Sequence, residues 1–475
     1  MTSQMTRSIG LVGLGTMGAA LASNIAEKGF DIAVYNRTVQ TTHDFVAQAG
    51  PLAPRITGCD TLEALVASMK PPRAIILMVP AGPVVDAQIA ALAPLLAGND
   101  LIIDAGNANF RDTNRRSEAA AKSGPAFLGM GVSGGEEGAR HGPSIMGGGR
   151  KEHWDSVAPM LEAISAKADD GSPCATWMGE AGAGHFVKMV HNGIEYADMQ
   201  MIAETYGMMR DGMGLAAADC GALFGKWNEG ILKSYLVEIS ANVSNAVDPA
   251  TGKPVLDIIL DRAGQKGTGR WTVIEAQHLA TPVSVIEAAV GARNVSAMLP
   301  VRKSGEALFG AAPERFATIP EAQALESAMI AGKILCYAQG FAMMEAASRD
   351  FGWSLPLPAI ARVWRAGCII RSAMLNDMAA ALESDATSNL IFADYFSQLL
   401  KQHHGALRNV VSTAMLNGHA VPALSVGLAW FDQIRTGRST ANMIQAQRDF
   451  FGAHSFERID SEGAHHGPWG LHSGT

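Results

Sequence analysis

Short apolar runs alternate with helical patterns over the first third of the chain. The apolar runs have the length and the β-rich composition of strands, and they lie at residues 8–13, 32–35, 74–79 and 101–104. Residues 19–28 and 61–69, which lie between these runs, have the composition of helices. This alternation predicts an α/β domain whose parallel sheet is covered by helices on both faces.

The pattern changes at residues 168–183, which are rich in turn formers and poor in helix formers. Long amphipathic stretches rich in Ala, Met and Leu follow, at residues 185–213, 320–351 and 355–382 among others. The chain is polar from residue 437 onward and has few helix formers after Phe451. We therefore predict three parts: an α/β domain (1–181), a large all-α domain (182–437) and a C-terminal tail (438–475), either disordered or docked on another surface.

The helical part contains two segments that resemble each other. Lys188-Met189-Val190, followed later by the Trp-x-x-Gly motif at 227–230, resembles Lys333-Ile334-Leu335, followed by the same motif at 364–367. Each motif leads into an apolar run that contains Lys or Arg next to Ser, at Lys233-Ser234 in the first copy and at Arg371-Ser372 in the second. The match is short, and chance resemblance is the alternative to a diverged internal repeat. The second copy lacks the polar residues of the first, so we expect it to serve as scaffold.

The composition is that of an ordinary globular protein, with 48% apolar and 17% charged residues. The net charge of −8 argues against a nucleic-acid partner, which needs a concentrated basic surface. No uncharged apolar run approaches the roughly 18–20 residues of a membrane span. The stretch at 9–22 imitates a signal peptide, but four glycines interrupt it.

The cysteines and histidines predict neither disulfides nor a metal site. The five cysteines are odd in number and have no C-x-x-C spacing, which favours reduced thiols in a cytoplasmic protein. His403 and His404, like His465 and His466, are adjacent pairs that we expect in polar loops. They lack the H-E-x-x-H spacing and cysteine partners, so we expect no catalytic metal.

A glycine turn joins the first predicted strand to the first predicted helix. Gly13, Gly15 and Gly18 have the G-x-G-x-x-G spacing. Gly13 permits a tight turn, Gly15 lets a pyrophosphate approach the backbone, and Gly18 allows the helix to pack closely on the strand. The phosphates would then lie at the helix N-terminus. Because it opens the first β–α unit, this spacing predicts a Rossmann-type domain that binds a nicotinamide dinucleotide.

The end of the second predicted strand indicates which dinucleotide is bound. NAD-binding domains usually place a carboxylate here to hold the ribose hydroxyls, and it would repel a 2′-phosphate. This chain has Asn36, Arg37 and Thr38 instead, and the Arg37 guanidinium can pair with a phosphate as a fork. We therefore expect NADP, while an exposed surface arginine is the alternative interpretation.

The first long helix of the all-α domain carries a polar face. Lys188, His191, Asn192 and Glu195 fall on one side of a helix at the spacing i, i+3, i+4 and i+7, and Tyr196 borders them. A solvated surface is the alternative, but His and Asn are poor choices for an exposed helix. A lysine with a carboxylate two turns away is a plausible base and acid pair, provided that burial lowers the lysine's pKa.

Two glycine-rich segments are candidate anion sites. Residues 132–140 contain Ser133, Gly134 and Gly135, and their backbone amides could hold a carboxylate, although a plain surface loop is equally compatible. Residues 262–271 contain Lys266 and Thr268, which could bind a second anion, but this segment lacks the G-x-x-x-x-G-K-[ST] pattern of a nucleotide P-loop.

With these motifs in place, the chain resembles the family of decarboxylating 6-phosphogluconate dehydrogenases. The matching runs, in chain order, are GLGTMG, YNRTV, SGGEEGAR, GAGHFVKMVHNGIEY, DRAGQKGTGRW and ANMIQAQRDFFGAH. They extend from residue 13 to residue 454, so the resemblance covers nearly the whole chain. The run around Lys188 is the most specific, because related β-hydroxyacid dehydrogenases keep the lysine but not the spacing to Glu195.

The resemblance implies an oxidative decarboxylation in the pentose phosphate pathway. Neutral Lys188 would take the proton of the C3 hydroxyl of 6-phosphogluconate while hydride leaves C3 for NADP. Protonated Lys188 would then polarise the 3-keto group as CO2 departs. Glu195 would protonate C1 of the enediol and so yield ribulose 5-phosphate. The β-keto group is the electron sink, so no metal is needed.

The resemblance also implies binding roles. The substrate carboxylate and hydroxyls would be held by Asn107, Ser133, Gly134, Gly135, His191 and Asn192. The substrate phosphate would be held by Tyr196, Lys266, Thr268 and Arg293, and by Arg448 and His454 from the tail of a partner subunit, which requires a homodimer. The cofactor would be held by Gly13, Leu14, Gly15, Thr16, Met17, Gly18, Asn36, Arg37, Thr38, Val79, Pro80, Ala81 and Asn107.

The chain departs from the family pattern at a few positions. Pro80 stands where the family usually has Lys or Gln, which puts a side-chain contact to the cofactor in doubt. The sequence around Asn107 is altered, and Phe450 and Ser455 replace the usual Tyr and Thr. None of these changes removes a catalytic group.

Two other functions compete with this one. A related dehydrogenase for a short, non-phosphorylated hydroxy acid would share Lys188 and the glycine turn but would not need Lys266, Arg293 and Arg448. A non-enzymatic NADP sensor would be expected to have lost Lys188 or Glu195, and both are present.

Overall fold

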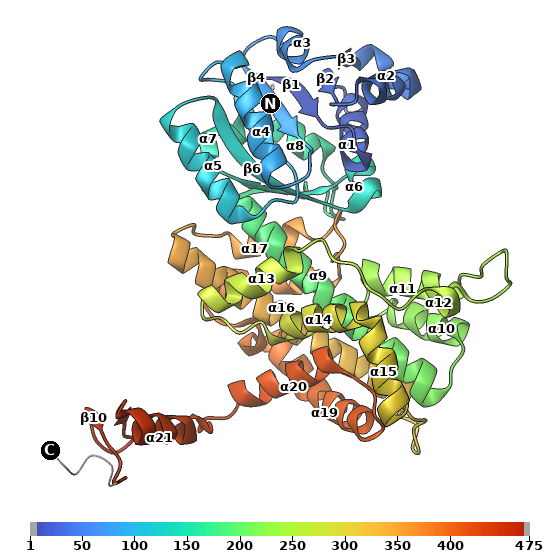
Figure 1. The fold of residues 1–475 in the computed structure, drawn as a ribbon, viewed down its shortest axis with the longest axis vertical. Helices are drawn as coiled ribbons and strands as arrows, with labels where there is room; N and C mark the ends of the chain where they lie inside the picture. Colours follow the sequence, from blue (N-terminus) through green and yellow to red (C-terminus); the bar gives the residue numbers. More distant parts are fainter. Residues whose placement is uncertain (1–6, 470–475) are drawn as a thin grey trace. The chain divides into compact units, whose positions relative to one another are not determined.

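An eight-stranded sheet is built from the N-terminal part of the chain (Figure 1). The structure, a computed structural model, describes residues 7–469 and divides into two units, Met1–Gly427 and Leu428–Thr475. The strands follow the order β3-β2-β1-β4-β5-β6-β7-β8. Their bounds are β1 Ser8–Val12, β2 Ile32–Tyr35, β3 Ile56–Cys59, β4 Arg73–Leu77, β5 Leu101–Asp104, β6 Ala126–Ser133, β7 Ser144–Gly148 and β8 Ala175–Gly179.

Helices connect these strands and cover both faces of the sheet, as the alternating pattern predicts. The helices are α1 Thr16–Glu27, α2 Val39–Gln48, η1 Gly50–Arg55, α3 Leu62–Ala67, α4 Pro83–Leu92, η2 Ala93–Leu95, α5 Phe110–Lys122, α6 Gly135–His141, α7 Lys151–Asp155 and α8 Ala158–Ile164. Leu21 of α1 and Leu161 of α8 pack in the core on one face, and Leu65 of α3 and Val85 of α4 pack in the core on the other. We call residues 8–179 the sheet region.

The sheet is not wholly parallel, so that prediction is wrong in part. β1 to β6 are parallel, but β7 runs antiparallel to β6, and β8 is parallel to β7. The turn-rich stretch at 168–183 also contains β8, which the sequence analysis missed. The β3-β2-β1-β4-β5-β6 order is that of a Rossmann-type domain, with the glycine turn at the end of its central strand β1.

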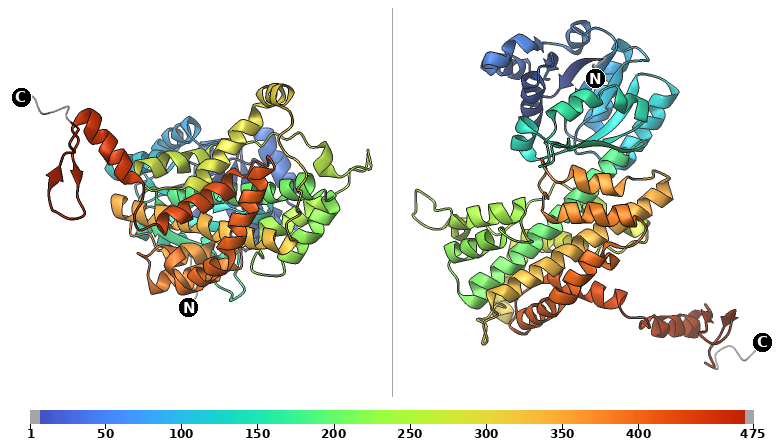
Figure 2. Two further views of the ribbon diagram at one scale, coloured as in Figure 1. Left: turned by 90° about the horizontal axis from the view of Figure 1, so that it is seen from below. Right: turned by 180° about the vertical axis from the view of Figure 1, so that it is seen from behind.

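Helices make up the rest of the first unit, and we call residues 183–427 the helical region (Figure 2). Its elements are α9 Ala183–Gly207, the π-helix η3 Met208–Met213, α10 Ala217–Trp227, α11 Tyr235–Asn245, α12 Val255–Ile258, α13 Thr268–His278, α14 Ser284–Ala297, α15 Leu299–Phe309, α16 Ala322–Phe351, α17 Leu357–Val363, α18 Met374–Ser384, η4 Leu390–Phe392, α19 Asp394–Leu416 and α20 Pro422–Ile434, which continues into the second unit. The two long helices α9 and α16 pack against each other.

The two similar segments meet in the structure. The backbone N–H of Tyr235 donates to the carbonyl of Arg371 (3.0 Å), and the N–H of Ala373 donates to the carbonyl of Lys233 (2.9 Å). Ser234 and Ser372, which occupy matching places in the two copies, therefore pair in an antiparallel bridge. Such reciprocal pairing is the arrangement that two copies related by a pseudo-twofold axis would make.

Three predictions about helices need correction. The single helical pattern at 355–382 is two helices, α17 and α18. His403 and His404 lie inside helix α19 and not in a polar loop, and His403 is buried. The polar tail after residue 437 contains a twelve-residue helix, α21 Ala441–Gly452.

The second unit, Leu428–Thr475, has its own local structure around Asp449. After α21, β9 Phe456–Glu457 and β10 Ala464–His465 form a small antiparallel hairpin. The Asp449 carboxylate is buried and accepts hydrogen bonds from the N–H of Ser455 (2.9 Å), the N–H of Gly467 (2.8 Å) and the indole of Trp469 (2.6 Å). These donors hold the pKa of Asp449 well below its usual range.

Among residues 7–469, no helix combines the length and the apolar composition needed to cross a membrane.

Candidate active site

A cavity of about 1060 Å³ lies between the sheet region and the helical region. Its volume lies at the upper end of the roughly 300–1,000 Å³ of small-molecule pockets. Most of the residues implicated by sequence line it, namely Gly15, Thr16, Met17, Gly18, Val79, Pro80, Ala81, Asn107, Ser133, Gly134, Gly135, Lys188, Asn192, Glu195, Tyr196, Lys266, Thr268 and Arg293.

The glycine turn at one end of the cavity fits the phosphates of a dinucleotide. Gly13 has φ +102°, and a Cβ there would lie 2.4 Å from the carbonyl oxygen of Met78. A Cβ on Gly18 would lie 1.9 Å from the carbonyl oxygen of Gly13, so the helix packs directly on the turn. In contrast, a Cβ on Gly15 would meet no described atom within 4 Å, so the backbone at the start of α1 is open to a ligand.

Asn36 supports this turn from the end of β2. Its side-chain oxygen accepts a hydrogen bond from the N–H of Leu14 (3.0 Å), and its amide donates to the carbonyl of Thr38 (3.2 Å). Gly13, Leu14, Asn36, Arg37 and Thr38 lie outside the lining of the cavity. Arg37 is exposed beside the turn, where its guanidinium remains available to an anion.

Glycines in the sheet bring α9 unusually close to β6 and β7. A Cβ on Gly131 of β6 would lie 2.5 Å from Cβ of Lys188, and a Cβ on Gly184 of α9 would lie 2.5 Å from the carbonyl oxygen of Met146. Because Gly131 and Gly184 have no side chains, α9 packs directly on the two strands. This contact places Lys188 at the inner wall of the cavity, beside the end of β6.

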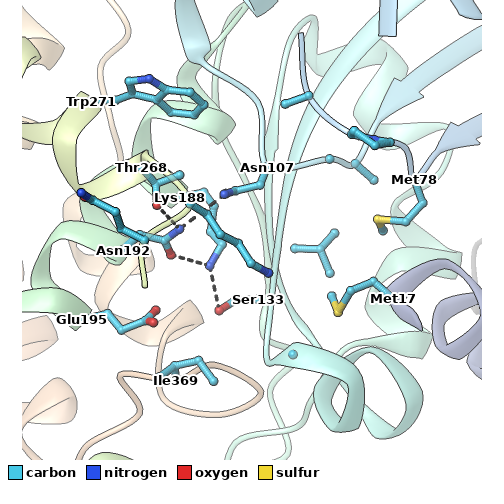
Figure 3. A pocket seen from close by; sticks show the side chains of 18 of the residues that line it. Met17, Met78, Asn107, Ser133, Lys188, Asn192, Glu195, Thr268, Trp271 and Ile369 are labelled. Atoms are coloured by element: carbon cyan, nitrogen blue, oxygen red, sulfur yellow. Dashed lines mark hydrogen bonds between the residues drawn. The ribbon is translucent and has the colours of Figure 1, made fainter. Parts of the chain in front are cut away.

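The Lys188 amine is buried among neutral oxygen acceptors (Figure 3). It donates to the Asn192 side-chain oxygen (2.8 Å) and to the Ser133 hydroxyl (3.1 Å). Burial lowers the pKa of Lys188 below its usual range, and the charge of Glu195 opposes this change only in part. A lysine with a depressed pKa has a larger neutral fraction and is better suited to accept a proton.

His191 and Asn192 complete the surroundings of the amine. The His191 ring lies 3.3 Å from the Ser133 hydroxyl through Nε2 and 3.0 Å from the Asn192 side-chain oxygen through Nδ1. Burial, followed by the nearby Lys188 charge, lowers the pKa of His191 well below its usual value, which favours the neutral imidazole. Asn192 also donates to Thr268 (3.0 Å) and lies 3.5 Å from the Asn107 side-chain oxygen. His191 does not line the cavity, so it orients Ser133 and Asn192 from behind them.

Glu195 lies one helical turn beyond His191 on α9, and it lines the same cavity as Lys188. Burial raises the pKa of Glu195, while the charges of Lys188, Arg293 and Lys266 partly oppose that rise. A carboxyl group with a raised pKa retains its proton to higher pH and can serve as an acid. The polar face predicted on α9 is thus not a solvated surface: Lys188, His191, Asn192 and Tyr196 are buried, and the Glu195 side chain is 20% exposed.

A cationic corner lies next to Glu195. The Arg293 guanidinium stacks 3.7 Å from the centre of the Tyr196 ring and donates to the carbonyl of Gly264 (2.7 Å). The N–H of Lys266 donates to the Tyr196 hydroxyl (3.3 Å). Gly267 is the N-cap of helix α13, which begins at Thr268. Two cations beside a helix N-terminus make a suitable site for a phosphate.

The glycine-rich stretch at 132–140 is not a surface loop. Ser133 ends β6, Gly134 turns the chain with φ +110°, and Gly135 begins the short helix α6. A Cβ on Gly134 would lie 2.6 Å from the carbonyl oxygen of Gly367, so this turn packs tightly against the segment between α17 and α18.

The sequence analysis missed several lining residues, of which Trp271 and Ile369 are the largest apolar ones on the substrate side. Figure 3 shows Trp271 above Thr268, and Ile369 below Ser133 on the side of Glu195. Trp271 lies in the segment 262–271, for which the sequence predicts only the anion-binding residues Lys266 and Thr268. Ile369 belongs to the second copy of the repeat, so the prediction that this copy is only scaffold is wrong at this residue.

Arg448 and His454 lie in the second unit. Arg448 is exposed on α21 and donates to Gln445 (2.8 Å), and His454 follows the end of the same helix. Within residues 7–469, no group of three or more His, Cys, Asp or Glu side chains has the arrangement of a metal site.

Comparisons with known proteins match this chain to one family along nearly its full length. The profile described as the NAD binding domain of 6-phosphogluconate dehydrogenase matches residues 8–179, and the profile of the 6-phosphogluconate dehydrogenase C-terminal domain matches residues 184–469. The NADP(+)-dependent, decarboxylating 6-phosphogluconate dehydrogenase of Bacillus subtilis is 46% identical over 98% of this chain and 99% of its own. The decarboxylating enzyme of Schizosaccharomyces pombe is 44% identical over 96% of this chain and 93% of its own.

A solved structure agrees with these matches. The 6-phosphogluconate dehydrogenase of Plasmodium falciparum, described in its apo form and in complex with NADP+ and with 6-phosphogluconate, superposes with a TM-score of 0.93. It is 39% identical, over 97% of this chain and all of its own. Matched along nearly its full length by both domain profiles, by relatives and by this structure, the chain belongs to the 6-phosphogluconate dehydrogenase family.

Proposed function

We propose that this protein converts 6-phosphogluconate to ribulose 5-phosphate and CO2 and reduces NADP to NADPH. The observation that carries the proposal is the buried Lys188 amine, which has a lowered pKa and neutral partners, in one cavity with Glu195, whose pKa is raised. Two groups whose surroundings shift their pKa values in opposite directions are suited to base and acid roles.

The chain's own groups account for the proton transfers. Neutral Lys188 takes the proton from the C3 hydroxyl of the substrate. NADP, when bound, supplies the acceptor for the hydride that leaves C3. Lys188, now an ammonium, gives its proton to the 3-keto oxygen while the C1–C2 bond breaks and CO2 leaves, and the electron pair of that bond forms an enediol. Glu195 then protonates the carbon that has lost CO2, and Lys188 takes back the proton of the O3 hydroxyl as the ketone of the product forms.

Positions around these two residues support the binding roles. Ser133 and Asn192 contact the Lys188 amine, and Asn107 lies 3.5 Å from Asn192; all three offer hydrogen bonds to the carboxylate and hydroxyls of a sugar acid. Lys266 and Arg293 with Tyr196 supply the charge and the hydroxyl that a terminal phosphate needs. A non-phosphorylated hydroxy acid would leave this cationic corner without a partner.

The cofactor preference rests on Arg37. Its exposed guanidinium stands next to the glycine turn, where a carboxylate would select NAD. Replacing Arg37 with Ala should raise the KM for NADP about tenfold or more, because a charged hydrogen bond is worth about 1.5–3 kcal/mol, and should leave the KM for NAD unchanged. Arg55→Ala, which removes an exposed arginine paired with Asp31 elsewhere in the sheet region, is the matched control.

We further propose that the protein is a homodimer whose tails are exchanged, so that Arg448 and His454 reach the phosphate in the partner's cavity. Their place at the end of α21, in a unit folded around Asp449, supports this assignment. Truncation before Arg448 should destroy phosphate recognition, and Arg448→Ala should raise the KM for 6-phosphogluconate. The same KM in the truncated chain as in the wild type would rule out a role for the tail. Arg438→Ala, an exposed arginine earlier in the same unit, should have no effect.

The domain limits at 181/182 and 437/438 remain part of this proposal, as does a cytoplasmic location. The latter is supported by five free cysteines, all of them buried.

The experiment that tests the activity compares substrates and cofactors. Reduced cofactor and released CO2 are measured with 6-phosphogluconate and with unphosphorylated gluconate, each with NADP and with NAD. We expect one CO2 for each NADPH, and turnover with 6-phosphogluconate and NADP far above the other three combinations. Faster turnover with gluconate, or reduction without CO2, would contradict the proposal.

A further inference from the structure

An arginine of α5 and a glutamate of α13 form an ion pair that joins the two sides of the cavity, although neither residue lines it. Arg111 lies in the first turn of α5, and Glu275 lies two turns into α13. The Arg111 guanidinium donates through Nε to one Glu275 oxygen (2.9 Å) and through Nη2 to the other (2.7 Å). This bidentate geometry is the strongest and most directional form of ion pair between protein side chains.

The pair connects the segments that present two of the substrate-facing groups. Asn107 precedes α5 by three residues, and Asn109 caps that helix by accepting from the N–H of Arg111 (2.9 Å). On the opposite wall, Thr268 begins α13. Asn192 bridges the two, since it donates to Thr268 (3.0 Å) and lies 3.5 Å from Asn107. The distance between α5 and α13 therefore sets the width of the cavity where Asn192 spans it.

Burial makes Glu275 depend on Arg111. Glu275 is 3% exposed, whereas the Arg111 side chain is 53% exposed and reaches in from the surface. Both Glu275 oxygens are occupied by Arg111. Removing Arg111 would leave a buried carboxylate without its partner, which is strongly destabilising, so this contact constrains the position of α13.

The same face of α13 is also tied to the helix that carries Lys188. Thr268, Thr272 and Glu275 follow the i, i+4, i+7 spacing, and all three are buried. The Thr272 hydroxyl donates to the carbonyl of Met189 (2.8 Å), the residue next to Lys188. One end of α13 is therefore held by α9, and the other by α5 through Arg111.

We propose that Arg111 and Glu275 are a positioning pair for the reaction, which latches the wall bearing Asn107 to the wall bearing Thr268. The inference rests on the proposed function for its substrate. Neither residue lines the cavity, so the pair acts through Asn107, Asn192 and Thr268 and not by touching the substrate. Its effect should fall on turnover and on substrate KM, because misplacing the reacting groups by about 1 Å can cost on the order of 10²-fold in rate.

The test uses the full chain and four changes. Arg111→Ala and Glu275→Gln remove one partner each, the Arg111→Glu/Glu275→Arg exchange reverses the pair, and Arg365→Ala is the control. Arg365 pairs with Asp170 (2.9 Å) and also joins the helical region to the sheet region, but neither residue lines the cavity. We expect kcat/KM for 6-phosphogluconate to fall about 10- to 100-fold in both single variants. It should recover at least in part in the exchange and change less than about twofold in the control.

Two further readouts do not depend on activity. The dissociation constant for NADP alone should change far less than kcat/KM, because the glycine turn that would hold the cofactor phosphates lies between β1 and α1, and the pair joins α5 to α13. Amide hydrogen exchange in residues 268–278 should speed up in Arg111→Ala and not in Arg365→Ala.

The outcomes separate this inference from the proposed function. Unchanged kcat and KM in folded Arg111→Ala and Glu275→Gln, with only a lower Tm, would overturn the positioning role. A wild-type protein that fails to oxidise 6-phosphogluconate would instead overturn the proposed function. In that case the exchange rates of α13 still test the latch, and unchanged rates would overturn it as well.

Discussion

Two buried lysines on two adjacent helices behave as opposites. Lys188 of α9 and Lys333 of α16 occupy matching places in the two similar segments, and both are almost inaccessible to solvent. Lys333 forms an ion pair with Asp198 at 3.0 Å, in which both side chains are about 1% exposed. Lys188 faces a cavity and donates to the neutral oxygens of Ser133 and Asn192.

The difference shows how surroundings determine the role of one side chain. Lys333 and Asp198 are each other's buried ion-pair partners across α16 and α9, so neither is free for chemistry and losing one would leave the other unpaired. Neutral acceptors leave burial as the larger influence, so the pKa of Lys188 falls. The carboxyl groups of α9 differ in the same way. Asp198 forms an ion pair with Lys333, whereas Glu195, one turn earlier, lines the cavity and has a raised pKa.

The largest expected effect is on turnover at Lys188. Lys188→Ala removes the proposed base, so kcat should fall toward the upper end of the about 10²–10⁴-fold range for general acid–base catalysis. NADP binding should be nearly intact, since the glycine turn is untouched. Steady-state kinetics and a titration with NADP check both points, and near-normal turnover would contradict the assignment.

The second effect is on stability at Lys333. Lys333→Met leaves Asp198 buried without its partner, so unfolding should become easier by about 3–5 kcal/mol. Denaturant unfolding measures the change. The double variant Lys333→Met/Asp198→Leu removes both charges and should recover most of the loss. If Lys333→Met were as stable as wild type but inactive, the contrast between the two lysines would fail.

A smaller loss of turnover is expected at Glu195. Glu195→Gln keeps the shape but cannot donate a proton, and kcat should fall by about 10²-fold with little change in the KM for 6-phosphogluconate. Asp198→Asn, assayed below its unfolding temperature, is the matched control and should retain most of its turnover. A defect confined to KM would indicate that Glu195 binds the substrate and is not the acid.

The pH profile sharpens the same contrast. Activity needs a neutral Lys188, which favours high pH, and a protonated Glu195, which favours low pH. The product gives a bell-shaped dependence of kcat/KM, with apparent pKa values that belong to the pair. The lowered pKa of Lys188 and the raised pKa of Glu195 bring its limbs closer together than the groups' usual values would. In Glu195→Gln the residual activity should rise with pH without the alkaline fall, whereas Asp198→Asn should keep both limbs.

The sequence predicts some of this site from local patterns alone. The G-x-G-x-x-G spacing after an apolar strand is sufficient for the turn at Gly13, and the helical spacing from Lys188 to Glu195 is sufficient for their shared face. Both patterns are formed by residues that are close together in the sequence. The meeting of Asn107 and Thr268 at Asn192, and of Ser133 with Lys188, could be expected only from the family resemblance, because tertiary packing brings these separate segments together.

Strands β3, β6, β7 and β8 are not among the strands predicted from the sequence, and for β6 and β7 glycine gives a physical cause. β6 and β7 contain glycines where helices and aromatic rings press on the sheet: a Cβ on Gly131 would strike Lys188, and one on Gly147 would lie 2.1 Å from the Trp154 ring. These positions need glycine for close packing, so the strands lose the β-branched residues that reveal a strand in a sequence. Ile369 was missed for a related reason, since an apolar residue carries no mark of the cavity that it lines.

Chemical rescue of Lys188→Ala tests most directly the claim that the Lys188 amine is the base. Small primary amines of graded pKa are added to the variant, and NADPH formation is measured with 6-phosphogluconate, with Lys333→Ala as the parallel sample. We predict that amines restore turnover in Lys188→Ala according to their basicity and have no effect on Lys333→Ala. Absence of rescue by every amine, in a variant that still binds NADP and 6-phosphogluconate as the wild type does, would contradict the account.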